Sequence, residues 1–249
     1  MANDNQFFSR SEALLGEKTV QRLANSHVLV VGVGGVGSWC AEALVRTGVG
    51  HLTLMDDDTV ATSNVNRQCP ATSKTIGRPK VDALAERLRE INPSAEIRAM
   101  VARYPFDHPT NLSISQSVNS LISQSVNQSI EQFSLVIDAI DSVDCKARLI
   151  LNAFAAHVPI ISSMGAALRM DPTKVRLSRF DKVQGDGLAK ALRNRFRRIG
   201  AWPGKFMCVW SEETPLQVAE RGSVMPVTAT FGMSLAAEAI RQLSHRGEE

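Results

Sequence analysis

A glycine-rich run directly after an apolar stretch has the residue types and spacing that bind phosphate. The apolar residues are 28–31, a helical pattern covers 38–46, and the run between them is Gly32-x-Gly34-Gly35-x-Gly37. A strand that leads into a helix over such glycines leaves backbone N–H groups and a helix N-terminus available to an anion. Gly32 permits a tight turn, Gly34 lets a phosphate approach the backbone, and Gly37 lets the helix pack closely on the strand. The spacing therefore predicts a nucleotide site.

An acidic residue stands where a Rossmann-like unit binds a ribose. The second apolar run, 51–55, ends at Asp56, which is 19 residues beyond Gly37. In such units a carboxylate about 20 residues beyond the glycines accepts hydrogen bonds from the ribose. Glycines alone could serve packing only, but a strand, a helix and a carboxylate at these spacings together favour nucleotide binding.

Charged and amide side chains are dense after that carboxylate. They are Asp56, Asp57, Asp58, Asn64, Asn66, Arg67, Gln68, Arg78 and Lys80. Arginine and lysine beyond a glycine-rich loop suit a triphosphate, because its outer phosphates need cationic partners. A nicotinamide enzyme does not need this cluster, so we expect a nucleoside triphosphate rather than a dinucleotide. The plainer interpretation of Arg67 and Lys80 is an ordinary solvated surface.

Two further carboxylates, Asp138 and Asp141, follow the apolar run 133–137. A carboxylate at the carboxyl end of a parallel strand lies at the ligand edge of an open sheet, where it can hold Mg²⁺ on phosphates. Either residue could instead cap the next helix. Of the two, we favour Asp141 as the magnesium ligand.

Taken together, these residues resemble the adenylating domain shared by ubiquitin-activating enzymes and by the bacterial enzymes that activate sulfur-carrier proteins, the ThiF/MoeB/HesA superfamily. Within it the chain looks most like the tRNA threonylcarbamoyladenosine dehydratase family, and the similarity extends over residues 8–243. The motifs that carry it are Gly37-Ser38-Trp39, Asn64-Val65-Asn66-Arg67, Val136-Ile137-Asp138-Ala139-Ile140-Asp141-Ser142 and Val227-Thr228-Ala229-Thr230-Phe231-Gly232.

The resemblance implies an enzyme that uses ATP to dehydrate, and so cyclise, N6-threonylcarbamoyladenosine next to the anticodon of tRNA. It places the nucleotide against the four glycines, Asp56 and Asp58, with Asp56 as ribose ligand. It makes Asn64, Arg67 and Lys80 the phosphate ligands and puts Asp141 near magnesium. Arg10 matches an arginine that family members offer to ATP from the neighbouring subunit, which implies a homodimer. The resemblance then assigns catalysis to Arg67, Lys80, Asp141 and Arg10. It leaves open whether the protein uses a monovalent cation and whether it has a cysteine desulfurase or sulfur-acceptor partner.

Cysteine usage helps to distinguish the candidate functions. The four cysteines, Cys40, Cys69, Cys145 and Cys208, are scattered and form no Cys-x-x-Cys pair, so we expect no disulfide framework and no zinc site. Enzymes that activate sulfur carriers usually have two such pairs, and their lack here weighs against an adenylyltransferase for a sulfur-carrier protein. Cys208 lies between apolar residues and is expected to be a small hydrophobe rather than a nucleophile.

A nicotinamide oxidoreductase and a non-catalytic tRNA-binding adaptor are two further candidate functions.

Length and composition predict the frame that positions these residues. The chain has 249 residues, 44% of them hydrophobic, and a formal charge of +3, which fits a soluble globular protein. We expect one α/β domain over 1–249, with a Rossmann-like, doubly wound, mostly parallel sheet, helices on both faces and a C-terminal α+β extension. The first residues lack the basic and apolar regions of a signal peptide, so we expect the cytoplasm.

Periodicity predicts the remaining elements. Helical patterns over 12–24 are expected to cover one side of the sheet and to include the dimer-reaching arm, and Lys80 opens a helix over 81–91. Strands are expected over 96–101, 158–163 and 175–180. The small residues in Met164-Gly165-Ala166-Ala167 suggest either close approach to a substrate or a packing need. The stretch 224–243 is expected to form a core helix, because its apolar length is too short for a membrane span, and Glu238 and Arg241 are expected on the exposed edge of this helix.

Segment 110–132 has low complexity. Its residues 114–119, Ile-Ser-Gln-Ser-Val-Asn, recur at 122–127. Two copies are too few for a solenoid. The segment is interpreted as an expanded surface loop or an amphipathic hairpin that duplicated locally, with a partner-docking or tRNA-contacting insertion as the alternative.

Segment 174–205 is strongly basic. Its net charge is +8, from ten cations and the two carboxylates Asp181 and Asp186, so the rest of the +3 chain sums to −5. The cations are Lys174, Arg176, Arg179, Lys182, Lys190, Arg193, Arg195, Arg197, Arg198 and Lys205. On a helix over 188–199, an apolar face that includes Leu192, Phe196 and Ile199 leaves most basic groups outward. Such asymmetry is typical of a protein that binds a polyanion. The resemblance indicates tRNA, and a solvated face is the plainer interpretation.

Overall fold

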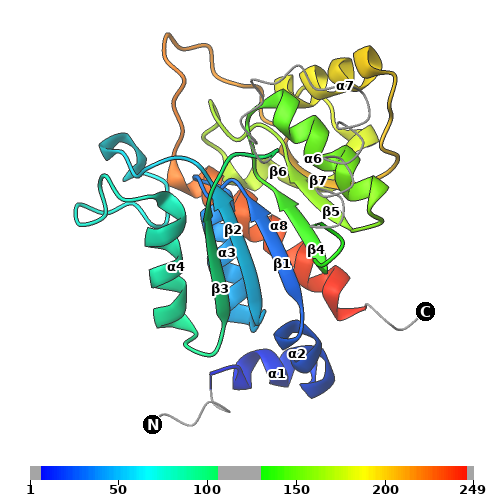
Figure 1. The fold of residues 1–249 in the computed structure, drawn as a ribbon. Helices are drawn as coiled ribbons and strands as arrows, with labels where there is room; N and C mark the ends of the chain where they lie inside the picture. Colours follow the sequence, from blue (N-terminus) through cyan, green and yellow to red (C-terminus); the bar gives the residue numbers. More distant parts are fainter. Residues whose placement is uncertain (1–6, 106–129, 246–249) are drawn as a thin grey trace, which may run out of the picture.

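A seven-stranded sheet forms the centre of the computed structural model, which describes residues 7–105 and 130–245 (Figure 1). In spatial order its strands are β3 (Glu96–Val101), β2 (His51–Asp56), β1 (His27–Val31), β4 (Leu135–Asp138), β5 (Ile160–Ser163), β7 (Met207–Ser211) and β6 (Val175–Arg179). Every neighbouring pair is parallel except β6 and β7. This is the mostly parallel, Rossmann-like arrangement expected from the sequence, and β7 and β6 extend it at one edge.

The strand order reverses beside β1. This strand pairs with β2 on one side and with β4 on the other, so the connections that leave β1 and β4 run to opposite sides of the sheet. Open α/β sheets bind their ligands in the crevice that such a reversal leaves at the carboxyl ends of the strands.

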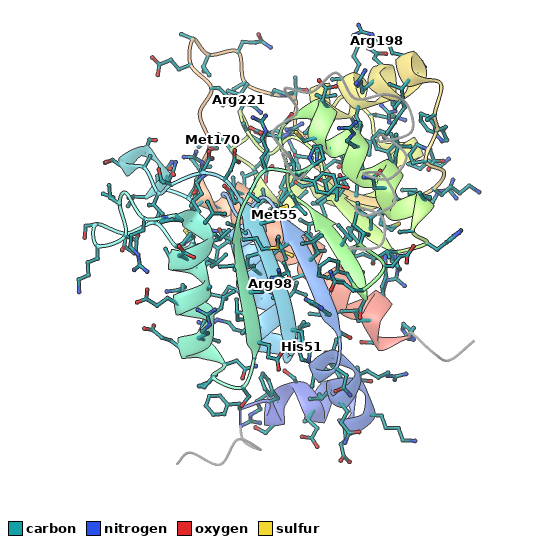
Figure 2. The ribbon with its side chains drawn as sticks, viewed as in Figure 1. His51, Met55, Arg98, Met170, Arg198 and Arg221 are labelled. Carbon is teal, nitrogen blue, oxygen red and sulfur yellow. The ribbon has the colours of Figure 1, made fainter. Side chains whose placement is uncertain are left out.

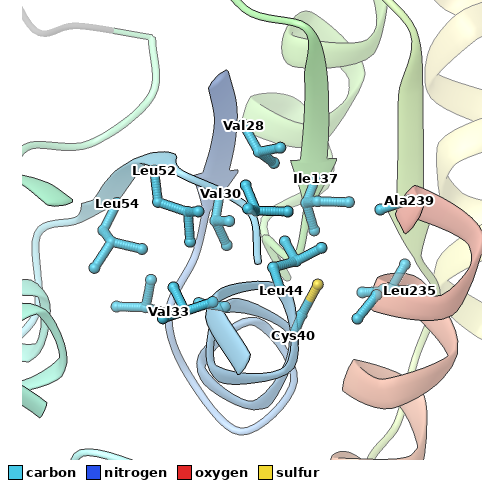
Figure 3. Packing of buried hydrophobic residues seen from close by; sticks show 14 of the residues in the cluster. Val28, Val30, Val33, Cys40, Leu44, Leu52, Leu54, Ile137, Leu235 and Ala239 are labelled. Carbon is cyan, nitrogen blue, oxygen red and sulfur yellow. The ribbon is translucent and has the colours of Figure 1, made fainter. Parts of the chain in front are cut away.

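Helices cover both faces of the sheet, as expected. They are α3 (Gly37–Thr47), α4 (Lys80–Ile91), α6 (Val143–Ala155), α7 (Gly187–Ile199) and α8 (Met225–Ser244). Val28 and Val30 of β1 belong to one apolar cluster with α3, α4 and α8, and Leu29 and Val31 belong to a second cluster with α6 and α7. Alternate residues of a strand point to opposite faces, so a strand buried on both faces has a continuous apolar sequence. Figure 3 shows the first cluster between the sheet, α3 and α8.

The N-terminal helices differ from the expectation. The pattern over 12–24 is interrupted at Gly16, whose φ is +82°, and forms α1 (Ser9–Leu15) and α2 (Glu17–Ala24). They do not cover a face of the sheet but lie beside the amino ends of its strands (Figure 1). Backbone hydrogen bonds fix this position, because the N–H of Gly50 donates to Leu23 O at 3.1 Å and that of His51 to Ser26 O at 3.2 Å.

The long C-terminal helix α8 is a core helix, but one of its predicted surface residues is buried. Glu238 is only 2% exposed. Its carboxylate accepts hydrogen bonds from Arg241 at 2.6 and 2.7 Å and from Gln242 at 2.7 Å. The prediction that Glu238 lies on an exposed edge is therefore wrong, because these donors satisfy the buried charge. Among the described residues, no helix has the length and apolar character needed to cross a membrane.

The other predicted elements are found close to their expected bounds, including β3, β5, β6, α4 and α7. Short 3₁₀ helices lie at η2 (Thr62–Asn64), η3 (Pro172–Lys174) and η4 (Phe180–Lys182). On α7 the buried side chains are Ala189, Leu192 and Phe196, while Ile199, expected on the apolar face, is 40% exposed. Ile199 is the last residue of α7. Most of the low-complexity segment 110–132 lies outside the described residues.

Candidate nucleotide site

A cavity of about 570 Å³ opens at the reversal of the strand order, at the carboxyl ends of β1, β2, β4 and β5. Nearly all the residues predicted to bind the nucleotide line it. They are Gly32, Gly34, Gly35, Asp56, Asp58, Asn64, Arg67, Lys80 and Asp141. The fold therefore brings predicted site residues that are more than 100 positions apart along the chain to one cavity.

Two glycines of the run are required by geometry. Gly32 has a φ of +86°, and a Cβ there would lie 2.7 Å from Ala139 O. A Cβ on Gly37 would lie 1.8 Å from Gly32 O, far inside van der Waals contact. Gly32 thus makes the turn out of β1 and Gly37 allows α3 to begin directly against it, which exposes the intervening backbone to the cavity.

The Asp56 carboxylate is held at the end of β2 by two backbone donors. Its Oδ2 accepts from the N–H of Val33 at 2.8 Å and its Oδ1 from the N–H of Asp58 at 2.9 Å. Burial raises the pKa of Asp56, and the two N–H donors and the Lys80 cation oppose the rise. Each oxygen has further lone pairs for a ligand donor.

Lys80 is the first residue of α4 and is almost completely buried, with 6% exposure. Its Nζ lies 2.6 Å from Asp58 Oδ2, and the Asp58 side chain is 66% exposed. The Lys80 ammonium group is therefore fixed beside the cavity by the exposed Asp58 carboxylate.

The loop that carries Arg67 is tied to the helix after the glycines. Trp39 Nε1 donates to Arg67 O at 2.9 Å. The Ser38 hydroxyl donates to Gly34 O at 2.6 Å and accepts from the N–H of Cys69 at 3.1 Å. Sequence reasoning treated Ser38 and Trp39 only as family motif residues, although their place directly after the glycines makes them the side chains of α3 nearest to the turn.

Side chains of this loop form hydrogen bonds within the loop itself. The Arg67 guanidinium donates to Ser63 O and to Asn66 Oδ1, both at 2.8 Å. Asn64 Oδ1 accepts from the N–H of Ala61 at 3.0 Å, so the Asn64 side chain closes the η2 turn.

Gln68 was not assigned a role from the sequence, and its side-chain oxygen is a buried acceptor. Its Oε1 is buried without a hydrogen-bond donor among the described residues, and Gln68 lines the cavity. A buried polar atom without a partner costs free energy. A bound molecule with N–H or O–H donors, such as a nucleoside, fits this position.

The two candidate magnesium carboxylates have different environments. Asp138 is fully buried, and its Oδ2 accepts from Lys146 Nζ at 2.7 Å and from the Ser162 hydroxyl at 2.6 Å. Asp141 is exposed in the cavity. Ser142 precedes α6, so neither aspartate is its N-cap. Within the described residues, the one cluster of three potential metal ligands is Asp56, Asp57 and Asp58, whose ligand atoms lie within 4.8 Å of one another.

Arg10 does not reach the cavity of its own chain. It lies exposed on α1, beside the amino ends of the strands, whereas the cavity lies at their carboxyl ends (Figure 1). Within one chain, Arg10 and the other predicted catalytic residues are therefore apart.

Three of the four cysteines are buried away from any reactive environment. Cys40, Cys69 and Cys208 are buried. Burial raises the pKa of Cys69 and of Cys208 to about 12 and that of Cys40 further still. Cys208 thus behaves as the small hydrophobe that the sequence suggested. Cys145 lines the cavity as a free thiol.

The basic segment 174–205 is divided by its own contacts. Four of its cations form ion pairs: Lys174 with Asp171, Arg176 with Glu212, Arg179 with Asp181 and Arg195 with Asp144. Arg193 donates to two backbone carbonyls and lies over the Phe180 ring, 5.0 Å from its centroid. Among the described residues no carboxylate pairs with Lys182, Lys190, Arg197, Arg198 or Lys205. The outward charge is therefore smaller than the sequence suggested.

Comparison with known proteins gives a consistent result over the whole chain. The model of the ThiF family matches residues 8–249. The chain is 37% identical over 218 residues to the tRNA threonylcarbamoyladenosine dehydratase of Bacillus subtilis, covering 86% of this chain and 77% of that protein. It is 32% identical over 228 residues to the molybdopterin-synthase adenylyltransferase of Salmonella typhimurium, covering 92% of this chain and 77% of the relative.

A solved structure extends the likeness to three dimensions. The crystal structure of the Escherichia coli tRNA N6-threonylcarbamoyladenosine dehydratase in complex with ATP superimposes with a TM-score of 0.84 at 34% identity. The match covers 98% of this chain and 96% of that one. The similarity therefore includes the sheet, the helices on both faces and the edge where the cavity lies.

Proposed function

The chain belongs to the ThiF family, and on that premise we propose that it is an ATP-dependent tRNA threonylcarbamoyladenosine dehydratase. The observation that carries the proposal is the cavity, where a glycine turn, a ribose-type carboxylate and two cations converge. The relatives of that name are 37% identical over most of the chain, and the similar solved structure holds ATP.

The nucleotide would lie along the carboxyl ends of β2, β1 and β4. Asp56 suits the ribose, because a carboxylate at the end of β2 accepts its hydroxyl protons. The open backbone at Gly34 and Gly35 suits the phosphates. Lys80, with Arg67 and the Asn64 amide, would bind the outer phosphates, and Gln68 Oε1 would accept from the nucleoside.

Magnesium fits the residues present. Asp141 is exposed in the cavity, and carboxylate oxygens are the ligands that Mg²⁺ prefers. Asp58 is exposed there as well, beside the phosphate ligand Lys80. A bound Mg²⁺ would neutralise phosphate charge and orient the leaving group.

The proposed chemistry is activation of a carboxylate. An oxygen of the substrate's threonyl carboxylate takes a phosphoryl or adenylyl group from ATP, with release of ADP or pyrophosphate. The neighbouring ureido group of the same substrate then attacks the activated carbon, and phosphate or AMP leaves with the former carboxylate oxygen. The net change is the loss of one water. Arg67 and Lys80 stabilise charge on the transferred group, and the tethered nucleophile removes the need for an enzyme nucleophile.

The partners follow from this assignment. Arg10 lies away from its own cavity, so its proposed contact with ATP needs a second copy of the chain, and we propose a homodimer. The cations of segment 174–205 that pair with no described carboxylate would bind the phosphates of tRNA, and we place the enzyme with tRNA in the cytoplasm. A sulfur-transfer partner and a monovalent cation rest on the resemblance alone.

The test is mass spectrometry of nucleosides after incubation of the protein with ATP, Mg²⁺ and tRNA that carries the modification. We expect N6-threonylcarbamoyladenosine to lose one water, and the product to disappear in Arg67→Ala. Unchanged nucleosides from a protein that binds ATP would refute the proposal. Pyrophosphate exchange that depends on a sulfur-carrier protein would favour the adenylyltransferase instead.

A further inference from the structure

The cavity extends well beyond the residues assigned to ATP. The strand order β2-β1-β4-β5 separates the ends of β2 and β5 by three strand spacings, about 14 Å. Asp56 lies at the β2 end, and residues 163–167, which follow β5, line the other end. Gly165 has no side chain and Ala166 and Ala167 have only a methyl group each, so no bulky side chain from these three residues fills this end of the cavity beside the nucleotide position.

A segment that includes Arg221 borders this second half and is held at several points. The Leu168 N–H donates to Gly222 O at 2.9 Å, and Leu168 O accepts from the N–H of Leu216 at 2.8 Å. Asn66 Nδ2, in the Arg67 loop, donates to Ser223 O at 2.9 Å. The backbone on both sides of Arg221 is therefore fixed to residues that directly follow or precede the cavity-lining residues Ala167 and Arg67.

Leu168, which hydrogen-bonds to Leu216 and Gly222 at the two ends of segment 216–222, has an unusual backbone conformation. Its φ is +64°, a value that few non-glycine residues adopt. Such a conformation persists only where the surrounding structure fixes it. Here both backbone polar groups of Leu168 are used to hold segment 216–222.

Arg221 differs from the two cations assigned to the phosphates of ATP, Lys80 and Arg67. Lys80 lies 2.6 Å from a carboxylate oxygen and Arg67 donates to two oxygens of its own loop. Arg221 lines the cavity, and within residues 7–105 and 130–245 it forms no ion pair. Figure 2 shows it at the same end of the molecule as Arg198, beyond the end of β2 marked by Met55. A guanidinium in this position suits a planar anion, above all a carboxylate, which it binds through two parallel hydrogen bonds.

We propose that Arg221 binds the free carboxylate of the threonylcarbamoyl group and so distinguishes modified from unmodified adenosine. This inference rests on the proposed function, which supplies a substrate with one carboxylate that must enter beside the nucleotide. Arg221 is then a specificity residue for the tRNA, whereas Arg67 and Lys80 serve ATP. A backbone phosphate of the RNA is the competing ligand for the same guanidinium.

The test compares the affinities of two tRNAs that differ only in this modification, measured without ATP so that nothing turns over. Wild-type protein is expected to bind the modified tRNA about tenfold or more tightly than the unmodified one, the scale of a charged hydrogen bond. Arg221→Ala should abolish this preference without changing affinity for unmodified tRNA or for ATP. Arg221→Lys should keep part of the preference. Arg198→Ala, on the outer surface, is the matched control and should weaken both tRNAs by the same factor.

Two results would overturn the assignment of Arg221. Equal weakening of both tRNAs in Arg221→Ala would show a contact to the RNA backbone. Weaker ATP binding with an unchanged preference for modified tRNA would place the residue in the phosphate site. Failure of the proposed function is separate, because it appears as unchanged nucleosides after incubation of wild-type protein with ATP, whichever tRNA Arg221 prefers.

Discussion

At the scale of single residues, the site depends on glycines that no other residue can replace. Gly32 needs its positive φ of +86°, and Gly37 lies so close to the Gly32 carbonyl that a Cβ has no space. Gly34 and Gly35 are different, since a Cβ on either would meet only ordinary contacts at 3.4 Å or more. The motif therefore combines two glycines that shape the turn with two that keep the backbone open to a ligand.

Gly37→Ala should lose both ATP binding and stability. The new Cβ would overlap Gly32 O at 1.8 Å, so α3 must move away from β1, at a cost of about 1–3 kcal/mol or more. Chemical denaturation and calorimetric titration with ATP measure the two effects. Gly187→Ala is the matched control, since it lies in a helix with no atom within 4 Å of the new Cβ. Equal behaviour of the two variants would contradict the role given to Gly37.

At the scale of elements, three segments distant in sequence are joined by one buried carboxylate. Glu42 of α3 accepts from Arg87 of α4 at 2.6 Å and from the Cys69 thiol, in the Arg67 loop, at 2.8 Å. Arg46 adds a third donor at 2.8 Å. Burial of Glu42 by itself raises its pKa, but these hydrogen bonds outweigh it and lower the pKa to about 2.

Glu42→Gln should destabilise the protein by about 1–2 kcal/mol at neutral pH, and its effect should depend on pH. The pKa of Glu42 is about 2 in the folded protein and 4.5 ordinarily. The stability that its charge contributes is therefore fully present above pH 4.5 and is lost as the pH falls toward 2. Denaturation at pH 7 and at about pH 3 should show the difference between wild type and variant shrinking at the lower pH. Glu86→Gln, in an exposed pair with Arg78, should show little difference at either pH.

Local sequence patterns predicted most of these elements but not their tertiary partners. Continuous apolar runs identified β1, β2 and β4, and the spacing of glycines and carboxylates identified their ligand-binding ends. The position of α1 and α2 beside the strand ends follows from Gly16 and from backbone bonds to Leu23 and Ser26, which no periodicity reveals. Glu238 was misplaced for the same reason, since its burial depends on Arg241 and Gln242 beside it. Gln68 and Arg221 became candidates only when the fold brought them to the cavity.

At the scale of the whole molecule, charge is distributed in a way that suits an RNA substrate. The cations Lys190, Arg197 and Arg198 lie on α7, whose first turn contributes Leu188 to the cavity. A helix of 13 residues is about 20 Å long, so the basic surface extends outward from the site. An anticodon that enters the cavity would leave its neighbouring phosphates against α7.

Replacing Lys190, Arg197 and Arg198 together by alanine should weaken tRNA binding at least tenfold and reduce its dependence on salt, because fewer counterions are released. The matched control is the double variant Arg176→Ala and Arg179→Ala, whose cations are already paired with Glu212 and Asp181. Binding curves at several salt concentrations should separate the two. An identical slope for wild type and the triple variant would exclude this surface as the RNA contact.

The most direct measurement of the central claim is a calorimetric titration of the protein with Mg²⁺-ATP and, separately, with NAD. We predict that ATP binds and NAD does not, and that Lys80→Met weakens ATP binding at least tenfold. Arg78→Met, outside the cavity and paired with Glu86, should bind ATP like the wild type. Tighter binding of NAD than of ATP, or no binding of ATP, would contradict the proposed function, because the ring closure of the threonylcarbamoyl group would then have no source of free energy.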